Sequence, residues 1–120
     1  MRQQEDQDQE EVSKRIIVIF VCVSNTCRSP MAEHLFRKYL KDVKNMDETK
    51  IQIISRSLTT NYEPKNSSAS TQGIEVMRNC YGIDMNSHRS KLLSAEDVRI
   101  ADVIIPVKRS LVESILYMDG

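Results

Sequence analysis

Cys22 and Arg28 are separated by five residues in a short stretch that reads Cys-Val-Ser-Asn-Thr-Cys-Arg. The stretch follows a continuous apolar run and precedes Ser29 and Pro30, a pair typical of a helix N-cap and first turn. Where a buried strand meets a helix start, backbone N–H groups and the helix dipole favour an anion. The Arg28 guanidinium can pair with two phosphate oxygens there, and a Cys22 thiolate can act as a nucleophile. The pattern therefore predicts a phosphate-binding loop that holds a reactive cysteine.

Other chemistries of cysteines and phosphate loops match this stretch poorly. It lacks the Gly-Lys-Ser/Thr of a nucleotide-binding loop and is not a C-x-x-C redox pair. The spacing of Cys22 and Cys27 is wider than that of usual zinc ligand pairs, and no second Cys or His pair completes a ligand set, so we expect no metal. A plainer interpretation, with an inert thiol at Cys22 and a surface charge at Arg28, stays open. The position between a strand and a helix favours the reactive interpretation.

Apolar runs and helical spacings predict the elements that must position this loop. The expected strands are residues 15–21, 50–55 and 102–107, and the expected helices are residues 30–42, 69–81, a short one capped by Ser94, and 110–118. Gly82 is expected to stop one helix, and Pro106, which cannot donate to a ladder, to lie at a strand end. This order predicts an α/β fold: three layers, with a small parallel sheet of at least three strands flanked by helices.

The composition indicates one domain without a bulk charge. The 120 residues include 17 Lys+Arg and 17 Asp+Glu, which argues against binding nucleic acid or anionic lipid through net charge. The sequence contains no long apolar run and no signal peptide pattern, so we expect no membrane association. Three cysteines, an odd number, predict a reducing compartment and hence a cytoplasmic protein. Residues 1–13 are expected to form a disordered acidic tail before an α/β domain of residues 14–120.

Residues 21–33 resemble the signature of the low-molecular-weight protein tyrosine phosphatases almost position for position. A weaker resemblance extends over about residues 15–117. Its further matches are Ser55, residues 82–85, His88, and residues 102–105. The resemblance implies the fold of that family and a phosphatase that needs no cofactor. It also implies that a phosphotyrosine-containing protein or a small phosphate ester is the partner.

The resemblance also implies a role for each residue of the loop. Cys22 would be the nucleophile that becomes a phosphocysteine, and Arg28 would hold the phosphoryl oxygens and stabilise the transition state. The residues that would bind substrate, largely through their backbone, are Val23, Ser24, Asn25, Thr26, Cys27 and Ser29. Ser55 and His88 would support the loop, in one polar network with Asn25 and Ser29.

Three other side chains near the matched segments have weaker assignments. Cys27 matches a second loop cysteine that can form a reversible disulfide with the nucleophile, although a small packed thiol explains it equally well. Cys80 is expected in the core. The resemblance implies that Tyr62 lies in the loop that forms the wall of the substrate cleft, where we expect it to be exposed.

The sequence departs from the family pattern at three places. Ser24 replaces a glycine beside the anion, so we expect some backbone strain or a shifted N–H. Val107 and Lys108 replace a Met-Asp pair, so that a base stands where the family has an acid. The family's general acid, in an Asp-Pro pair, would lie beyond residue 120, and Asp119 comes too early to replace it. The last strand and helix of the family would lie there too. From the absent acid we expect weak activity, reduced about 10²–10⁴-fold. From the absent strand we expect an exposed sheet edge that allows homo-oligomers.

Three functions from different classes remain open on these grounds. The first is a cysteine-dependent phosphatase acting on phosphotyrosine or small aryl phosphates. The second is an impaired module that binds phosphate or phosphotyrosine with little turnover. The third, an arsenate reductase, needs further cysteines close together to relay a disulfide, and Cys80 is solitary.

Overall fold

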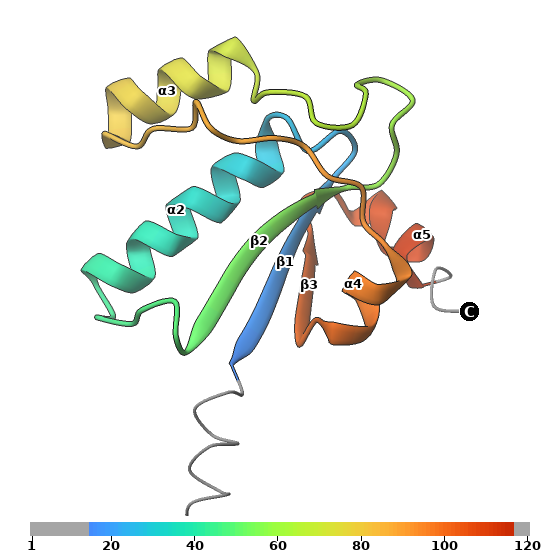
Figure 1. Cartoon of the computed structure of the whole chain (residues 1–120), viewed down its shortest axis with the longest axis horizontal. Coiled ribbons are helices and arrows are strands. Elements are labelled where there is room, and N and C mark those ends of the chain that lie inside the picture. Colours follow the sequence, from blue (N-terminus) through green and yellow to red (C-terminus); the bar gives the residue numbers. More distant parts are fainter. Residues whose placement is uncertain (1–14, 117–120) are drawn as a thin grey trace, which may run out of the picture.

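Residues 15–116 are described by a computed structural model, which shows three parallel strands in the order β2-β1-β3. The strands are β1 (Ile16–Cys22), β2 (Ile51–Ser57) and β3 (Val103–Pro106). β1 lies between the other two, with Ile16 opposite Ile51 on one side and Val18 opposite Val103 on the other. The predicted three-layer α/β fold with a small parallel sheet is confirmed (Figure 1).

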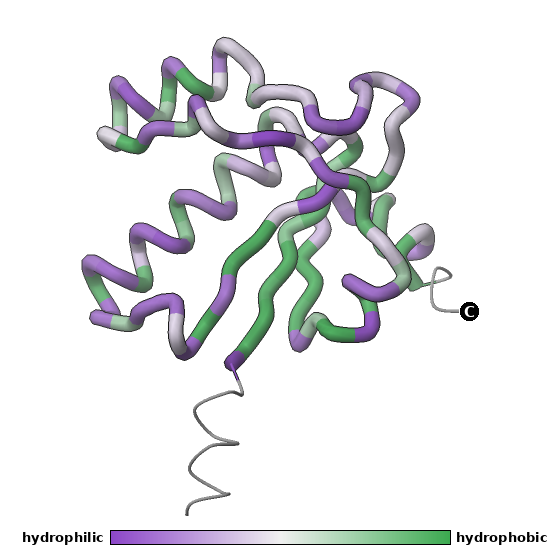
Figure 2. The backbone as a smooth tube through the Cα atoms, in the orientation of Figure 1, coloured by the Kyte–Doolittle hydropathy of each residue, from purple (hydrophilic) through white to green (hydrophobic). Residues whose placement is uncertain are grey.

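Apolar residues cover both faces of β1, because successive side chains of a strand point to opposite faces. Ile19 and Val21 pack with Leu111 and Ile115 on one face. Val18 packs on the other face, in a cluster with Leu40, Ile51 and Ile53. The continuous apolar run of β1 is thus explained by burial on both sides, as expected for a central parallel strand (Figure 2).

The helices lie on both sides of the sheet (Figure 1). Their bounds are α2 (Arg28–Asp42), α3 (Thr71–Tyr81), α4 (Ala95–Ile100), the 3-10 turn η1 (Arg109–Leu111) and α5 (Val112–Leu116). α2 packs against β1 and β2, whereas α4, η1 and α5 lie toward the other face. α3 reaches the core through Met77, which is fully buried beside Met85. All the expected helices are present, within a few residues of the predicted bounds.

The local signals for helix ends are largely confirmed. Gly82 follows α3 with φ 66°, the left-handed conformation that glycine adopts without penalty. Ser94 caps α4 in a capping box with Asp97. Pro106 is the last residue of β3. The prediction that Ser29 caps α2 is wrong, because the helix begins at Arg28 and Ser29 lies fully buried inside its first turn.

The predicted positions of Cys80 and Tyr62 can be compared with the structure. Cys80 is exposed on α3, so its predicted core position is wrong, whereas Tyr62 is exposed as expected. The acidic tail of residues 1–13 and Asp119 lie outside the described residues. Across residues 15–116, none of the helices is long and apolar enough to span a bilayer.

Candidate active site

The phosphate-binding loop predicted from the sequence connects the end of β1 to the start of α2. Cys22 is the last residue of β1 and is buried, whereas Arg28 is the first residue of α2 and is exposed. The carboxyl end of a central parallel strand is where open α/β sheets bind ligands. The fold therefore brings the two expected catalytic residues to the carboxyl end of the sheet. They lie beside the N-terminus of α2, a helix of 15 residues.

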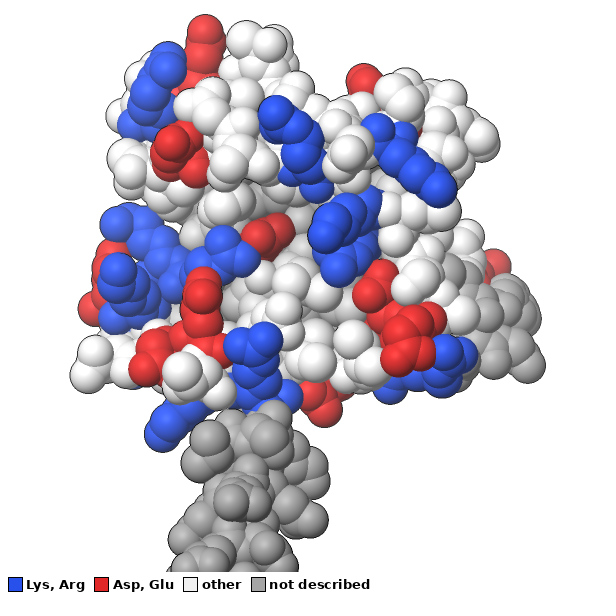
Figure 3. All heavy atoms as spheres, viewed as in Figure 1, with Lys and Arg blue, Asp and Glu red and all other residues white. Residues whose placement is uncertain are grey.

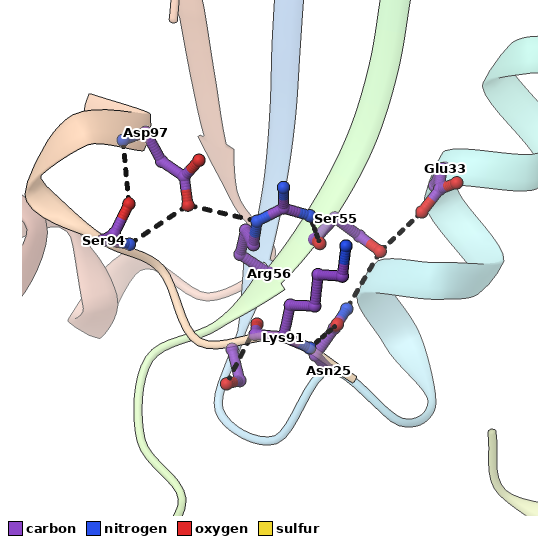
Figure 4. A network of polar contacts seen from close by, with 8 residues as sticks. Asn25, Glu33, Ser55, Arg56, Lys91, Ser94 and Asp97 are labelled. Atoms are coloured by element: carbon purple, nitrogen blue, oxygen red, sulfur yellow. Dashed lines mark hydrogen bonds and ion pairs between the residues drawn. The ribbon is translucent and has the colours of Figure 1, made fainter. Parts of the chain in front are cut away.

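Asn25 is the centre of the loop's hydrogen bonding. It is fully buried and has φ 58°, a left-handed conformation that asparagine tolerates better than most residues. Its side-chain Nδ2 donates to Ser29 Oγ at 2.8 Å and to Ser55 Oγ at 2.9 Å. Its Oδ1 accepts from the Lys91 backbone N–H at 3.0 Å (Figure 4). Both ends of the amide are thus paired, which fixes the backbone bend that the left-handed residue creates.

The Cys22 sulfur has two polar neighbours within the loop. The Asn25 backbone N–H donates to Sγ at 3.1 Å, and Ser29 Oγ lies 2.9 Å from it. Because Ser29 Oγ already accepts from Asn25, its own proton is free to point to the sulfur. The burial of Ser29 is therefore explained by a contact with Cys22 rather than by a helix cap.

A second arm of the network leaves Asn25 through Ser55. Ser55 Oγ donates to Glu33 Oε1 at 2.6 Å (Figure 4). Arg37 pairs with the other Glu33 oxygen at 2.5 Å. This arm ties the loop to β2 and to the second turn of α2. Ser55, which the resemblance suggests as a supporting residue, thus joins Asn25 to Glu33.

His88 and Lys91 reach the loop from the segment between α3 and α4. His88 Nε2 lies 2.8 Å from the Asn25 carbonyl oxygen, so a carbonyl that can only accept holds the proton on Nε2. Lys91 contributes its backbone N–H to Asn25, and its carbonyl accepts from Ser57 N at 2.7 Å. The contacts of Glu33, Arg37 and Lys91 in this network were not predicted from the sequence. Glu33 lies inside the family-like stretch and could have been found there, whereas a backbone N–H leaves no signal in a sequence.

The remaining loop residues present their carbonyls to neighbouring segments. Leu58 N donates to the carbonyls of Cys22 and Val23 at 2.9 and 3.2 Å, and Ser70 N donates to that of Thr26 at 2.7 Å. Cys27 is half-buried and free. These outward carbonyls restrain the loop on both sides.

The left-handed backbone conformation of the loop lies at Asn25 and not at Ser24, where strain was expected. Among residues 15–116, the non-glycine positions with positive φ are Asn25, Asn45 and Asn66, and Ser24 is not one of them. A serine at this position therefore needs no left-handed backbone, and the bend falls on the following asparagine.

Charges around the site are mixed rather than uniform. Lys108 is exposed, and the neighbouring Val107 N donates to the Val21 carbonyl at 2.9 Å. The Val107-Lys108 pair, which differs from the family pattern, therefore lies close to the loop. Arg56 is paired with Asp97 at 3.1 Å (Figure 4). Figure 3 shows acidic and basic side chains interspersed over the face in view, in agreement with a net charge of zero.

His34 follows Glu33 on α2 and lies close to the same network. Burial lowers the pKa of His34 below its usual value, and the nearby Glu33 carboxylate opposes this effect. A neutral imidazole is thus favoured near neutral pH. His34 and His88 are the two histidines of the chain.

Comparison with known proteins gives the same family that the loop suggests. The family model described as low molecular weight phosphotyrosine protein phosphatase matches residues 17–120. A mouse protein of that name is 37% identical over 93 residues, which is 78% of this chain and 55% of the mouse protein. The chain thus spans little more than half of the length of this curated relative.

Solved structures share the fold. The low molecular weight protein tyrosine phosphatase from T. tengcongensis is 38% identical, with a TM-score of 0.69 over 87% of this chain and 69% of that one. A Drosophila arginine phosphatase is 28% identical, with a TM-score of 0.72 over 84% of this chain and 60% of that one. The model match and these similarities, together with the loop between β1 and α2, show that the chain belongs to the low molecular weight phosphotyrosine protein phosphatase family.

Proposed function

We propose that this protein is a cysteine-dependent phosphatase in which Cys22 is the nucleophile and Arg28 binds the phosphoryl group. The observation that carries the proposal is the position of the Cys22 sulfur. It lies at the carboxyl end of a central strand, within 3.1 Å of two donors, the Asn25 N–H and the Ser29 hydroxyl. Hydrogen bonds to sulfur stabilise a thiolate, the reactive form of cysteine.

The proposed reaction has two displacement steps. The Cys22 thiolate attacks phosphorus, the bond from phosphorus to the ester oxygen breaks, and the departing oxygen takes up a proton. A water molecule then attacks the phosphocysteine, the S–P bond breaks, and inorganic phosphate and the thiolate are released. Each step moves one electron pair onto a leaving group, so the cycle needs no redox partner and no cofactor.

The loop's contribution would be positioning and charge stabilisation. Arg28 stands at the start of α2 and would present its planar fork to the phosphoryl group, and the backbone N–H groups of residues 23–28 would surround the equatorial phosphoryl oxygens. The network around Asn25, with Ser55 and His88, would hold these donors in place before substrate binds. This preorganisation supports catalysis rather than binding alone.

Phosphotyrosine in a protein or a small aryl phosphate is the substrate class that we propose first, from the family that the chain belongs to. Phosphoarginine is a second candidate, because a solved structure with this fold is described as an arginine phosphatase. Both substrates present a dianionic phosphoryl group to the same loop. They differ in the bond that breaks, which is P–O in one and P–N in the other.

The direct test is hydrolysis of p-nitrophenyl phosphate, a phosphotyrosine peptide and a phosphoarginine peptide by the wild type, Cys22→Ser and Cys80→Ser. Cys80 is an exposed thiol on α3 and serves as the matched control. We expect the wild type and Cys80→Ser to release phosphate at equal rates and Cys22→Ser to release none. Phosphate release by Cys22→Ser would refute the nucleophile assignment.

Rapid-mixing kinetics of the same reaction separate a phosphatase from a binding module. A burst of p-nitrophenol equal to the enzyme concentration, followed by steady turnover, would show both displacement steps. Saturable phosphate binding without any release of p-nitrophenol would replace the catalytic proposal with the binding module. Arsenate-dependent oxidation of thioredoxin, which we do not expect, would revive the reductase.

We further propose a cytoplasmic location and self-association through β3. The three free cysteines, Cys22, Cys27 and Cys80, suit a reducing compartment. β3 pairs with β1, and its Val103 and Ile105 side chains are exposed. An exposed strand edge is a template for a second chain. Sedimentation velocity across a concentration series tests the association, and a monomer at every concentration would exclude it.

A further inference from the structure

Glu33, His34 and His88 bring three metal-ligand groups together beside the loop. A carboxylate oxygen of Glu33 and one ring nitrogen from each histidine all lie within 4.8 Å of one another. Glu33 and His34 come from α2, whereas His88 comes from the segment between α3 and α4. All three residues are partly buried. The expectation of no metal rested on the spacing of Cys22 and Cys27 and on the lack of a second Cys or His pair at ligand spacing in the sequence. This cluster instead joins His34 and His88, which the fold brings together from distant positions.

The donor set matches the chemistry of a particular class of ions. Two imidazoles and one carboxylate are a recurrent protein ligand set for zinc, with a fourth position left to water. Imidazole nitrogen selects divalent transition metals over calcium and magnesium, which prefer oxygen ligands. The cluster therefore suits Zn²⁺ better than the alkaline-earth ions.

Two of the three side chains are already oriented by outer hydrogen bonds. His88 directs its Nε2 proton to the Asn25 carbonyl at 2.8 Å, which leaves the Nδ1 lone pair of a neutral ring available. A metal-bound histidine commonly donates its second N–H to a backbone carbonyl in this way. The Glu33 carboxylate is likewise held, by Ser55 Oγ at 2.6 Å and Arg37 at 2.5 Å. Because these partners already hold the two side chains, less conformational entropy is lost when a metal ion binds.

We propose that Glu33, His34 and His88 form a binding site for a divalent transition metal ion, with Zn²⁺ as the best match. The site is distinct from the Cys22 sulfur, which contacts Ser29 and Asn25 instead. It shares the loop's support, because His88 holds the Asn25 carbonyl and Glu33 holds Ser55. Metal binding at this cluster would therefore affect the phosphate loop through the contact of His88 with Asn25.

The first test is a Zn²⁺ titration of the full chain, followed by NMR of the imidazole signals. The chain has two histidines, and both belong to the cluster. We expect both sets of signals to shift together and to saturate at one equivalent of Zn²⁺. Saturable binding that leaves either histidine unshifted would overturn the proposal.

The second test compares Zn²⁺ affinity among variants by competition with a chromophoric chelator. His34→Asn removes a ligand that makes none of the loop's hydrogen bonds, so its fold can be checked by circular dichroism. We expect its affinity to fall at least about tenfold, since loss of an outer-shell partner alone costs about 10–100-fold. The exposed thiol variant Cys80→Ser should retain the wild-type affinity.

Cys22→Ser tests the competing thiolate site and separates this proposal from the phosphatase proposal. We expect the variant to bind Zn²⁺ as the wild type does, whatever its catalytic activity. Loss of binding in Cys22→Ser with full binding in His34→Asn would place the ion on the loop cysteine and overturn the proposal. Co²⁺ gives a matching readout, because a thiolate ligand adds a charge-transfer band that nitrogen and oxygen ligands lack.

Discussion

The two ends of β1 hold their polar groups in different environments. At the start of the strand, the Ile17 N–H donates to Asp102 Oδ2 at 2.8 Å, and Arg15 donates to the Glu48 carbonyl at 2.8 Å, both in exposed positions. At the other end, the hydrogen bonds of Asn25 and Ser29 have similar lengths but are fully buried. The lengths of these bonds are alike, whereas their access to water differs.

This difference decides how much each bond matters for the fold. Water replaces a lost partner at the exposed end, so a typical bond contributes about 0.5–1.5 kcal/mol net. At the buried end a lost partner leaves unpaired polar atoms, and the cost rises to about 1–3 kcal/mol for each group. We therefore expect the candidate active-site end of β1 to be the more sensitive to substitution, although it consists of polar residues.

The largest effect is expected at Asn25. Asn25→Gly removes the amide that pairs Ser29, Ser55 and the Lys91 N–H, and should lower the free energy of unfolding by about 3 kcal/mol. Asn25→Ala should cost about 1–2 kcal/mol more, because alanine resists the φ of 58° that glycine accepts. Urea denaturation of both variants measures the two contributions. Equal stability of the glycine and alanine variants would contradict the account of the backbone.

Ser55 offers a smaller test of the same end. Ser55→Ala leaves Asn25 Nδ2 and Glu33 Oε1 without their shared partner, so we expect a loss of about 1–2 kcal/mol by urea denaturation. Ser57→Ala is the matched control, because Ser57 is an equally buried serine on β2 with a single side-chain bond of 3.3 Å. A control loss as large as that of Ser55→Ala would show that burial, and not the network, sets the cost.

Features that depend on neighbouring positions could be predicted from the sequence, whereas contacts between distant positions could not. The strands, the helices and the Cys22-to-Arg28 loop follow from local patterns, because apolar spacing and turn residues act over a few positions. The inward turn of Ser29 depends on contacts with Cys22 and Asn25 in the folded loop, so the local helix-cap signal gave the wrong interpretation. Contacts between Glu33 and Ser55 join positions 22 apart, a pairing that no local pattern specifies.

At the exposed end of β1, Asp102→Ala should cost less than any change in the Asn25 network. Its carboxylate accepts from the Ile17 N–H, and water can take its place, so we expect a loss of about 0.5–1 kcal/mol in urea denaturation. Activity toward p-nitrophenyl phosphate should remain at the wild-type level, since Asp102 lies at the end of the sheet opposite Cys22. A loss larger than that of Ser55→Ala would reverse the ranking of the two ends.

The smallest effect is expected at Asp47, which precedes β2 at the same exposed end. Its pKa lies below the usual value because its carboxylate accepts from the Thr49 hydroxyl at 2.5 Å and from the Thr49 N–H at 3.1 Å. A lowered native pKa means that the carboxylate stabilises the fold above its unfolded pKa of about 3.9. That contribution is lost as the pH falls through the lower native pKa.

Asp47→Asn should therefore lower the stability slightly at neutral pH and flatten the acid limb of the stability curve below about pH 4, where the variant and the wild type should converge. Urea midpoints measured from neutral to acidic pH test this, with NMR titration of the Asp47 carboxyl as the direct check. Asp84 is a natural comparison, because its pKa is lowered in the same way by Asn86 at another exposed turn. If the wild type and Asp47→Asn had parallel acid limbs, this exposed bond would carry no stability, and the contrast between the two ends of β1 would be wider still.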